Sequence, residues 1–229
     1  MDITLVVALV IALALFFDFT NGFHDTANAM ATPIATGALR PKVAVAIAAV
    51  LNLVGAFLST EVARTISGGL IREGDGGVQI TPLMIFAGLI GAIVWNMVTW
   101  LFGLPSSSSH ALFGGLIGAV VVGAGFGAID GGVLLSKVVL PALLAPVIAC
   151  SVAFLATRLA YLIAARSDSA QGGFRYGQVF TSSLVSLAHG TNDAQKSMGV
   201  ITLTLVAAGF QTAGTGPEFW VIVVCALAI

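Results

Sequence analysis

The sequence contains very little charge: only 8% of its 229 residues are Asp, Glu, Lys or Arg, whereas a soluble domain carries about 25%. Hydrophobic residues make up 58% of the chain, and the mean hydropathy is +1.06. So few charged side chains cannot cover the surface of a soluble protein. The composition therefore predicts an integral membrane protein built from apolar helices that cross a lipid bilayer.

Other shortages exclude further classes of protein. The formal net charge is −1, so the chain lacks the basic surface that nucleic-acid binding requires. The two cysteines, Cys150 and Cys225, both lie in apolar runs, and we interpret them as buried thiols rather than as a disulfide or metal pair. The N-terminus lacks the basic region and the cleavage site of a signal peptide, so residues 3–20 are predicted to form a retained first span.

A polar stretch at residues 19–30 interrupts an otherwise apolar opening of the chain. An ionisable residue inside a membrane span is costly and usually lines a bundle interior or a transport pathway. Gly22 lies at the start of this stretch and predicts a break in the helix there; the alternative is a polar loop between two spans. The polar residues of the stretch are Asn21, His24, Asp25, Thr26 and Asn28.

A partial copy of this stretch returns at residues 189–198. Gly22, Asp25 and Met30 match Gly190, Asp193 and Met198 at the same spacing, and both copies lie within long apolar runs. This similarity predicts an internal duplication. We divide the chain into a first repeat (1–157), a polar cytoplasmic loop (158–176) and the start of a second repeat (177–229).

The number of crossings between the two copies determines how the repeats are related. Apolar runs at 43–60, 82–102, 110–126 and 133–157 predict four intervening spans. If each motif run (3–39 and 177–210) is one broken crossing, the second repeat is inverted; if each is a hairpin, the repeats are parallel. The first arrangement places most positive charges on one side, which favours it and puts the N-terminus outside. Those charges are Arg40, Lys42, Arg158, Arg166 and Arg175.

The predicted fold is thus all-α: a polytopic helical membrane protein with inverted-topology repeats and helices broken at the midplane, as in secondary transporters. A third polar element, Ser106–Ser109, precedes a helix, and helix N-termini favour anions. An alternative is that these serines only cap that helix. Lys196 is expected to pair with Asp193 and to add a fixed positive charge. The residues predicted to bind an anion are Thr26, Asn28, Ser106, Ser107, Ser108, Ser109, Thr191, Asn192 and Lys196.

Two carboxylates in the same region predict a coupling cation. Asp25 and Asp193 cannot approach an anion unless a proton or a cation lies between them, and carboxylate, amide and hydroxyl oxygens suit Na⁺. No cofactor other than Na⁺ or H⁺ is expected. Asn52 and Asn96 are assigned to hydrogen bonds between helices. The predicted sodium ligands are Asn21, Asp25, Asn28, Asp193 and Ser197, and the residues expected around them are Asp18, His24, His110 and His189.

Three elements together resemble the inorganic phosphate transporter (PiT) family. They are the motif at 21–28 (Asn-Gly-Phe-His-Asp-Thr-Ala-Asn), the element at 105–110 (Pro-Ser-Ser-Ser-Ser-His) and the motif at 189–196 (His-Gly-Thr-Asn-Asp-Ala-Gln-Lys). The resemblance implies a cation-coupled symporter for inorganic phosphate in the plasma membrane, often a homodimer, and not an enzyme. The family has a serine-rich element in each half and this sequence shows one, so we expect the last spans of the second repeat to lie beyond residue 229.

Two other functions would use some of the same residues. A sulfate permease of the same fold would also bind a tetrahedral anion, but sulfate has no proton to donate to Asp25 or Asp193. An intramembrane aspartyl protease would use those two carboxylates as its catalytic pair. Both copies read Gly-x-x-Asp rather than the Gly-x-Gly-Asp of such enzymes, which disfavours the protease.

Overall fold

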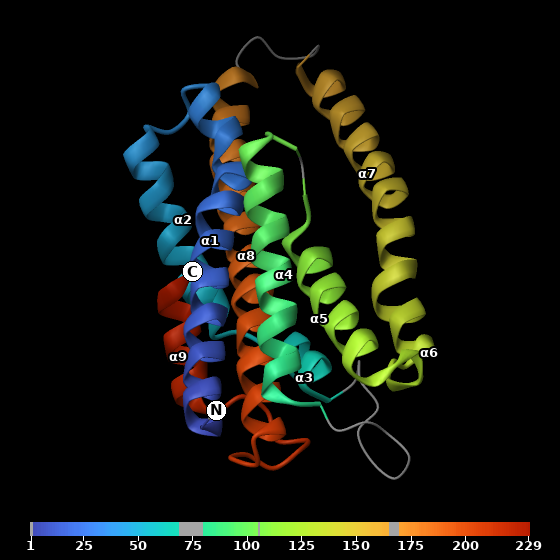
Figure 1. Cartoon of the computed structure of the whole chain (residues 1–229). Coiled ribbons are helices and arrows are strands. Elements are labelled where there is room, and N and C mark those ends of the chain that lie inside the picture. Colours follow the sequence, from blue (N-terminus) through green and yellow to red (C-terminus); the bar gives the residue numbers. More distant parts are fainter. Residues whose placement is uncertain (1, 69–79, 105, 165–169) are drawn as a thin grey trace.

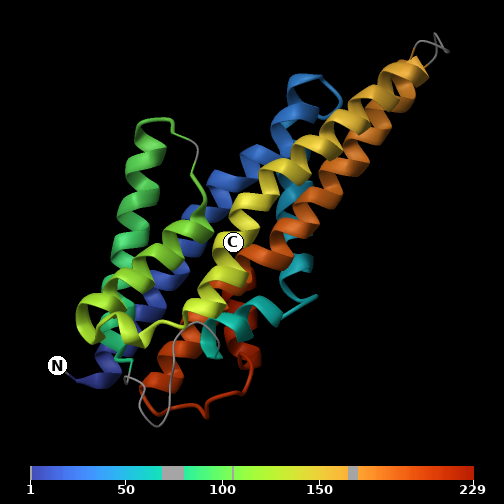
Figure 2. The same cartoon turned by 90° about the vertical axis from the view of Figure 1, so that its right-hand side faces the viewer.

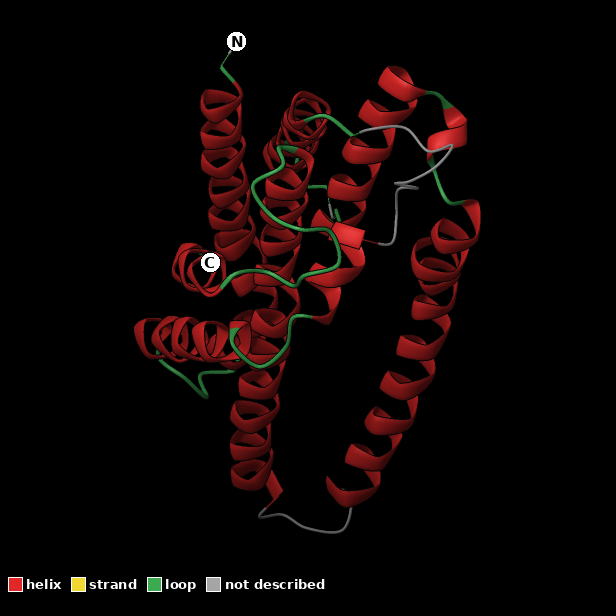
Figure 3. Cartoon of the chain, turned by 90° about the horizontal axis from the view of Figure 1, so that it is seen from below, coloured by secondary structure: helices red, strands yellow, loops and turns green. Residues whose placement is uncertain are grey.

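The computed structural model describes residues 2–68, 80–104, 106–164 and 170–229, and every regular element in this part of the chain is a helix (Figure 3). The side chains of residues 23–27, 67, 68, 170 and 171 also lie outside the description. The predicted all-helical class is confirmed. Three of the described helical segments are long and apolar enough to cross a membrane, namely Ile3–Gly22, Pro82–Leu101 and Gly131–Ala164.

Local sequence features place several helix ends. Pro41 and Pro82 each occupy a first helical position, where the missing N–H costs nothing. The side chain of Thr81 accepts a hydrogen bond from the Met84 N–H and caps the helix that follows. The α-helices are α1 (Ile3–Ala35), α2 (Pro41–Ala56), α3 (Glu61–Gly68), α4 (Pro82–Leu101), α5 (Ser108–Ala124), α6 (Gly131–Leu134), α7 (Leu140–Ala164), α8 (Ala170–Ala207) and α9 (Phe219–Ala228).

The two longest helices, α1 and α8, form the centre of the molecule and run in opposite directions (Figure 1). Helices α2 and α9 pack on one flank of this pair, and the α4–α5 hairpin packs on the other. The short α3 packs against α8. Helix α7 has no buried residue and stands at the edge of the bundle, leading back to the start of α8 (Figures 1 and 2). This arrangement surrounds the middle of α8 with other helices.

The predicted breaks at Gly22 and at residues 189–197 are wrong, because both motifs lie within continuous helices. A glycine inside a helix costs only about 1 kcal/mol relative to alanine, and neither motif contains a proline. Helix α1 has 33 residues and so spans about 50 Å, more than the roughly 30 Å of a bilayer core. Each motif run is therefore a single crossing, which excludes the hairpin alternative. The inverted relationship of the repeats stays a prediction, although it requires the antiparallel α1 and α8 seen here.

The motif glycines allow close helix packing instead. A Cβ on Gly190 would lie 2.5 Å from the Cα of Asn52, and one on Gly55 would lie 2.8 Å from the backbone nitrogen of Thr191. On α1, a Cβ on Gly22 would meet the carbonyl oxygen of Ile229. Small residues let backbones approach closely in membrane proteins. The crossing of α2 and α8 therefore depends on Gly55 and Gly190.

The structure shortens the predicted loops. Residues 61–68, which lie between the predicted spans 43–60 and 82–102, form α3, which buries Ala63 and Ile66 against the core. The predicted 158–176 loop is mostly helical, since α7 continues to Ala164 and α8 begins at Ala170. The charged residues Arg72, Glu73, Asp75, Arg166 and Asp168 lie outside the described residues.

Candidate functional site

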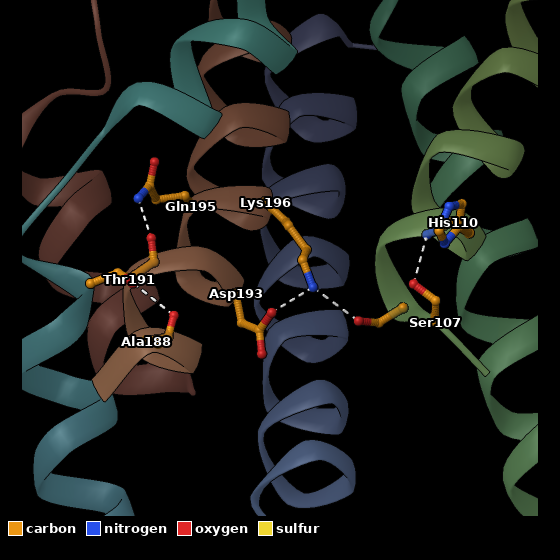
Figure 4. A network of polar contacts seen from close by, with 8 residues as sticks. Ser107, His110, Ala188, Thr191, Asp193, Gln195 and Lys196 are labelled. Atoms are coloured by element: carbon orange, nitrogen blue, oxygen red, sulfur yellow. Dashed lines mark hydrogen bonds and ion pairs between the residues drawn. The ribbon is translucent and has the colours of Figure 1, made fainter. Parts of the chain in front are cut away.

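A buried ion pair on α8 forms the centre of the site. Lys196 Nζ lies 2.6 Å from Asp193 Oδ1, one turn away on the same helix (Figure 4). Only 4% of Asp193 and 3% of Lys196 are exposed. The expected pairing of the two residues is confirmed. Because breaking such a pair leaves one buried charge without compensation, the pair holds both side chains in fixed positions.

The same ammonium group connects α8 with the serine run. Lys196 Nζ donates a hydrogen bond to Ser108 Oγ, 3.0 Å away. Ser108 is the first residue of α5, whose first backbone N–H groups have no partner within the helix. A positive side chain and the positive end of a helix dipole thus meet in the core. Both features favour a negatively charged ligand.

The four serines have different environments. Ser107 is exposed, and its Oγ accepts a hydrogen bond from the His110 N–H, 3.4 Å away, which caps α5 (Figure 4). Ser106 Oγ accepts a hydrogen bond from Trp95 Nε1, 3.1 Å away. Ser108 is buried and Ser109 is half-buried. The capping alternative therefore describes Ser107, whereas Ser108 faces the core.

Helix α1 brings two buried polar side chains to the same region. Asp18 and Asn21 lie one turn apart, and none of their side-chain oxygen or nitrogen atoms has a hydrogen-bond partner within the described part of the chain. Ser197 Oγ of α8 donates to the Ala14 carbonyl, 3.1 Å away, beside Asp18. The side chains of His24, Asp25 and Thr26 lie outside the described residues. Asn28, a predicted ligand of both ions, is exposed on α1.

A small cavity separates α1, α4 and the start of α5. Its size leaves room for about one water molecule, which is too little for a tetrahedral oxyanion. Asn96, which we had assigned to interhelical hydrogen bonding, lines this cavity; an amide within an otherwise apolar span was the signal that could have marked it. An anion bound here would require α1, α4 and α5 to move apart. The lining residues are Thr20, Asn21, Asn96, Met97, Ser106 and Ser108.

The remaining predicted residues lie around this centre. Thr191 Oγ1 donates to the Ala188 carbonyl, 2.7 Å away (Figure 4), and Asn192 is exposed. His189 is half-buried, and its Nδ1 has no hydrogen-bond partner in the described part of the chain. His110 is exposed at the start of α5. The structure thus brings Asn21, Ser106, Ser108, Asp193, Lys196 and Ser197 together and leaves Asn28 and Asn192 at the surface.

Gln195 has a role that the sequence did not reveal. Its Oε1 accepts hydrogen bonds from the backbone N–H groups of Val62 at 2.8 Å and Ala63 at 3.4 Å. Its Nε2 donates to the Thr191 carbonyl (Figure 4). These bonds satisfy the free N–H groups at the start of α3 and attach that helix to α8. No sequence pattern connects residues so far apart.

The chain is similar to known transport proteins. Residues 21–172 and 164–229 match the model of a family described as "Phosphate transporter family". A "Probable low-affinity inorganic phosphate transporter" of Mycobacterium leprae is 56% identical over 100% of this chain and 55% of its own length. A protein with the same description from Bacillus subtilis is 42% identical over 100% of this chain and 69% of its own length.

More distant comparisons agree with these. The "Low-affinity inorganic phosphate transporter PitA" of Escherichia coli strain K12 is 35% identical, covering 90% of this chain and 47% of that protein. A solved structure titled "The sodium-dependent phosphate transporter" superposes with a TM-score of 0.81 over 97% of this chain and 73% of that chain, at 19% identity. This likeness confirms the fold. The chain spans about half the length of the mycobacterial relatives it matches.

Proposed function

Because the chain belongs to the phosphate transporter family, we propose that it takes part in moving inorganic phosphate across a membrane together with a monovalent cation. The family is one of transporters rather than enzymes, and the apolar helices make this an integral membrane protein. We place it in the plasma membrane with its N-terminus outside. The coupling ion, this orientation and a homodimeric assembly are proposals that follow from the sequence.

The observation that carries the proposal is the buried Lys196–Ser108 hydrogen bond at the start of α5. Phosphate is an anion whose oxygens accept hydrogen bonds. The Lys196 ammonium, the Ser108 hydroxyl and the N–H groups at the helix start are donors that converge there. Since Asp193 neutralises Lys196 at 2.6 Å, the pair presents a hydrogen-bond donor without a large net charge.

The other predicted donors are assigned to the same path as proposals. Ser106 lines the small cavity with Ser108, so it would contact an anion when the helices separate. Thr26, Asn28, Thr191 and Asn192 would line the route to this point, together with Ser107 and Ser109. Alternating access requires such a site to open to each side in turn, and the small volume of the cavity supports a closed form.

Sodium is the proposed coupling ion. The solved structure of the same fold is titled as a sodium-dependent transporter, and the carboxylates Asp25 and Asp193 are the predicted acidic ligands. Hard oxygen ligands suit Na⁺ better than soft metals. The predicted ligand set therefore stands as a proposal for this chain, with Asn21, Asn28 and Ser197 as its neutral members.

Uptake of labelled phosphate into proteoliposomes tests the function. With an inward Na⁺ gradient, we expect concentrative uptake that collapses when Na⁺ is replaced by choline. Unlabelled phosphate should compete and sulfate should not. Uptake driven by a proton gradient alone would identify H⁺, rather than Na⁺, as the coupling ion. Equal competition by sulfate would favour the sulfate permease. The absence of uptake under every gradient would overturn the proposal.

A further inference from the structure

The carboxylate of Asp18 is fully buried on α1, with the Ser197 hydroxyl of α8 beside it. Its exposed fraction is 0%, and neither oxygen accepts a hydrogen bond from the described part of the chain. One turn further along α1, Asn21 is 2% exposed, and neither its amide oxygen nor its nitrogen is bonded in that same part. Buried polar groups are almost always paired, because an unpaired one costs several kcal/mol. Two such residues on one helix face indicate a ligand.

The balance of buried charge indicates the sign of that ligand. Among the described residues, three charged side chains are buried on α1 and α8: Asp18, Asp193 and Lys196. Lys196 already bonds Asp193 and Ser108, although Asp18 lies within electrostatic reach of both members of the pair. With both of these carboxylates ionised, the three described side chains carry one net negative charge. A buried carboxylate charge is tolerated only when a positive charge accompanies it.

The surrounding atoms indicate the kind of cation. The Asp18 carboxylate, the Asn21 amide oxygen and the Ser197 hydroxyl are hard oxygen ligands, the type that alkali and alkaline-earth cations prefer. The Ser197 hydroxyl lies within hydrogen-bonding reach of Asp18 and donates to the Ala14 carbonyl, and its oxygen lone pairs remain available to a metal ion. Cys225 of α9 is also buried and lies within electrostatic reach of Asp18. One uncompensated negative charge matches a monovalent ion.

We propose that Asp18 and Asn21 of α1, with Ser197 of α8, form a binding site for a monovalent metal cation, with sodium as its occupant. This inference rests on the proposed function and makes it more specific. The sequence pattern favoured Asp193 as a sodium ligand, but in this structure the Lys196 ammonium already bonds the Asp193 carboxylate. The second motif copy thus carries a resident positive charge, and the exchangeable cation binds at α1, next to the small cavity that Asn21 lines.

Thermal unfolding of the purified protein in detergent, without phosphate, tests the site directly. The unfolding midpoint is compared in NaCl and in choline chloride at equal ionic strength. We expect Na⁺ to raise the midpoint of the parent protein because it binds the folded state only. Asp18→Asn should abolish this rise. In choline, that variant should be more stable than the parent because its unpaired buried charge is gone.

Two further variants make the test specific. Asn21→Ala keeps the carboxylate but loses one ligand, so the Na⁺ concentration needed for half of the stabilisation should rise about tenfold. This variant decides the question if Asp18→Asn does not fold. Asp2→Asn makes the same chemical change at the exposed start of α1 and should respond to Na⁺ as the parent does.

Three outcomes would overturn the inference. In the first, Na⁺ raises the unfolding midpoint of Asp18→Asn and Asn21→Ala as much as that of the parent. In the second, the midpoint of the parent depends on pH but not on Na⁺. In the third, K⁺ or choline raises the midpoint as much as Na⁺ does. Phosphate uptake by the parent is measured separately. Uptake without a Na⁺ effect on unfolding rejects the cation site alone, whereas a Na⁺ effect without uptake rejects the proposed function and leaves the site in place.

Discussion

Among single residues, Lys196 stands out because its charged group is buried and bonded to two other side chains. It is 3% exposed and bonds both Asp193 and Ser108. Removing one partner of a buried ion pair costs about 3–5 kcal/mol, because the other charge is left buried and unpaired. We therefore expect Lys196→Met to lower the free energy of unfolding by about that amount, measured by denaturant unfolding in detergent.

A double variant separates charge from packing. Asp193→Asn combined with Lys196→Met removes both charges, and replacing a whole pair is often neutral, so it should recover most of the lost stability. Lys42→Met removes a cation from the exposed start of α2 and should stay within about 0.5 kcal/mol of the parent. If Lys196→Met unfolds as the parent does, the pair has no structural role.

The serine run offers a second prediction at this scale. Ser108→Ala removes the hydroxyl that accepts from Lys196, and bonds to charged groups are worth about 1.5–3 kcal/mol. Phosphate binding should weaken roughly ten- to a hundredfold, measured by calorimetry at saturating Na⁺.

Ser107→Ala is the matched control for this experiment. Ser107 caps α5 from the exposed side, so its loss should cost about 1 kcal/mol of stability and lower phosphate affinity much less than the loss of Ser108 does. Equal binding by both variants would mean that the whole run acts only as a cap.

For whole helices, the crossing of α2 and α8 limits what can replace glycine. A Cβ on Gly190 would lie 2.5 Å from the Asn52 Cα, and backbone atoms cannot move aside as a flexible side chain can. Gly190→Ala should therefore destabilise the fold by roughly 1–3 kcal/mol, seen as a lower thermal midpoint. On the same helix, Gly177 has open space around it, so Gly177→Ala should be neutral or stabilising by about 0.5–1 kcal/mol. Equal effects at both positions would contradict the close crossing.

Local features of the sequence predicted where helices start better than whether a helix is broken along its length. Helix starts at Pro41 and Pro82 follow from the geometry of proline itself. The pairing of Asp193 with Lys196 was also predictable, since residues three apart share a helix face. Gly22 was misinterpreted because its neighbour in space is Ile229, and packing across the sequence decides whether a glycine bends a helix or permits contact.

The site shows the same limit. Polar residues in apolar runs marked the region, and the serine run contacts the second motif through the bond between Ser108 and Lys196. Distant segments pack together to bury the Asp18 carboxylate without a hydrogen bond from the described residues. They also bring Gln195 of α8 to the backbone N–H of Val62 in α3. Such contacts leave no local pattern in a single sequence.

Over the whole molecule, charge is distributed unevenly between the two ends of the bundle. The end where α1 and α7 finish and α2 and α8 begin carries Arg40, Lys42, Arg158 and Arg175 and, in the described part of the chain, no acidic residue (Figure 1). At the opposite end, Asp2, Asp130 and Glu218 flank the helices together with Arg64 and Lys137. Positive residues near span ends are retained on the cytoplasmic side. The first end should therefore face the cytoplasm.

Labelling of single cysteines from each side of the membrane tests this orientation. In a background with Cys150→Ala and Cys225→Ala, we expect Lys42→Cys to react with an impermeant maleimide only when the cytoplasmic face is accessible. Lys137→Cys, exposed near the opposite end, should react from outside in intact cells. Because the start of α2 and the segment between α6 and α7 lie at opposite ends of the bundle (Figure 1), these two positions must report opposite sides. Labelling of both from the same side would contradict the arrangement of crossings, and reversed labelling would place the N-terminus in the cytoplasm.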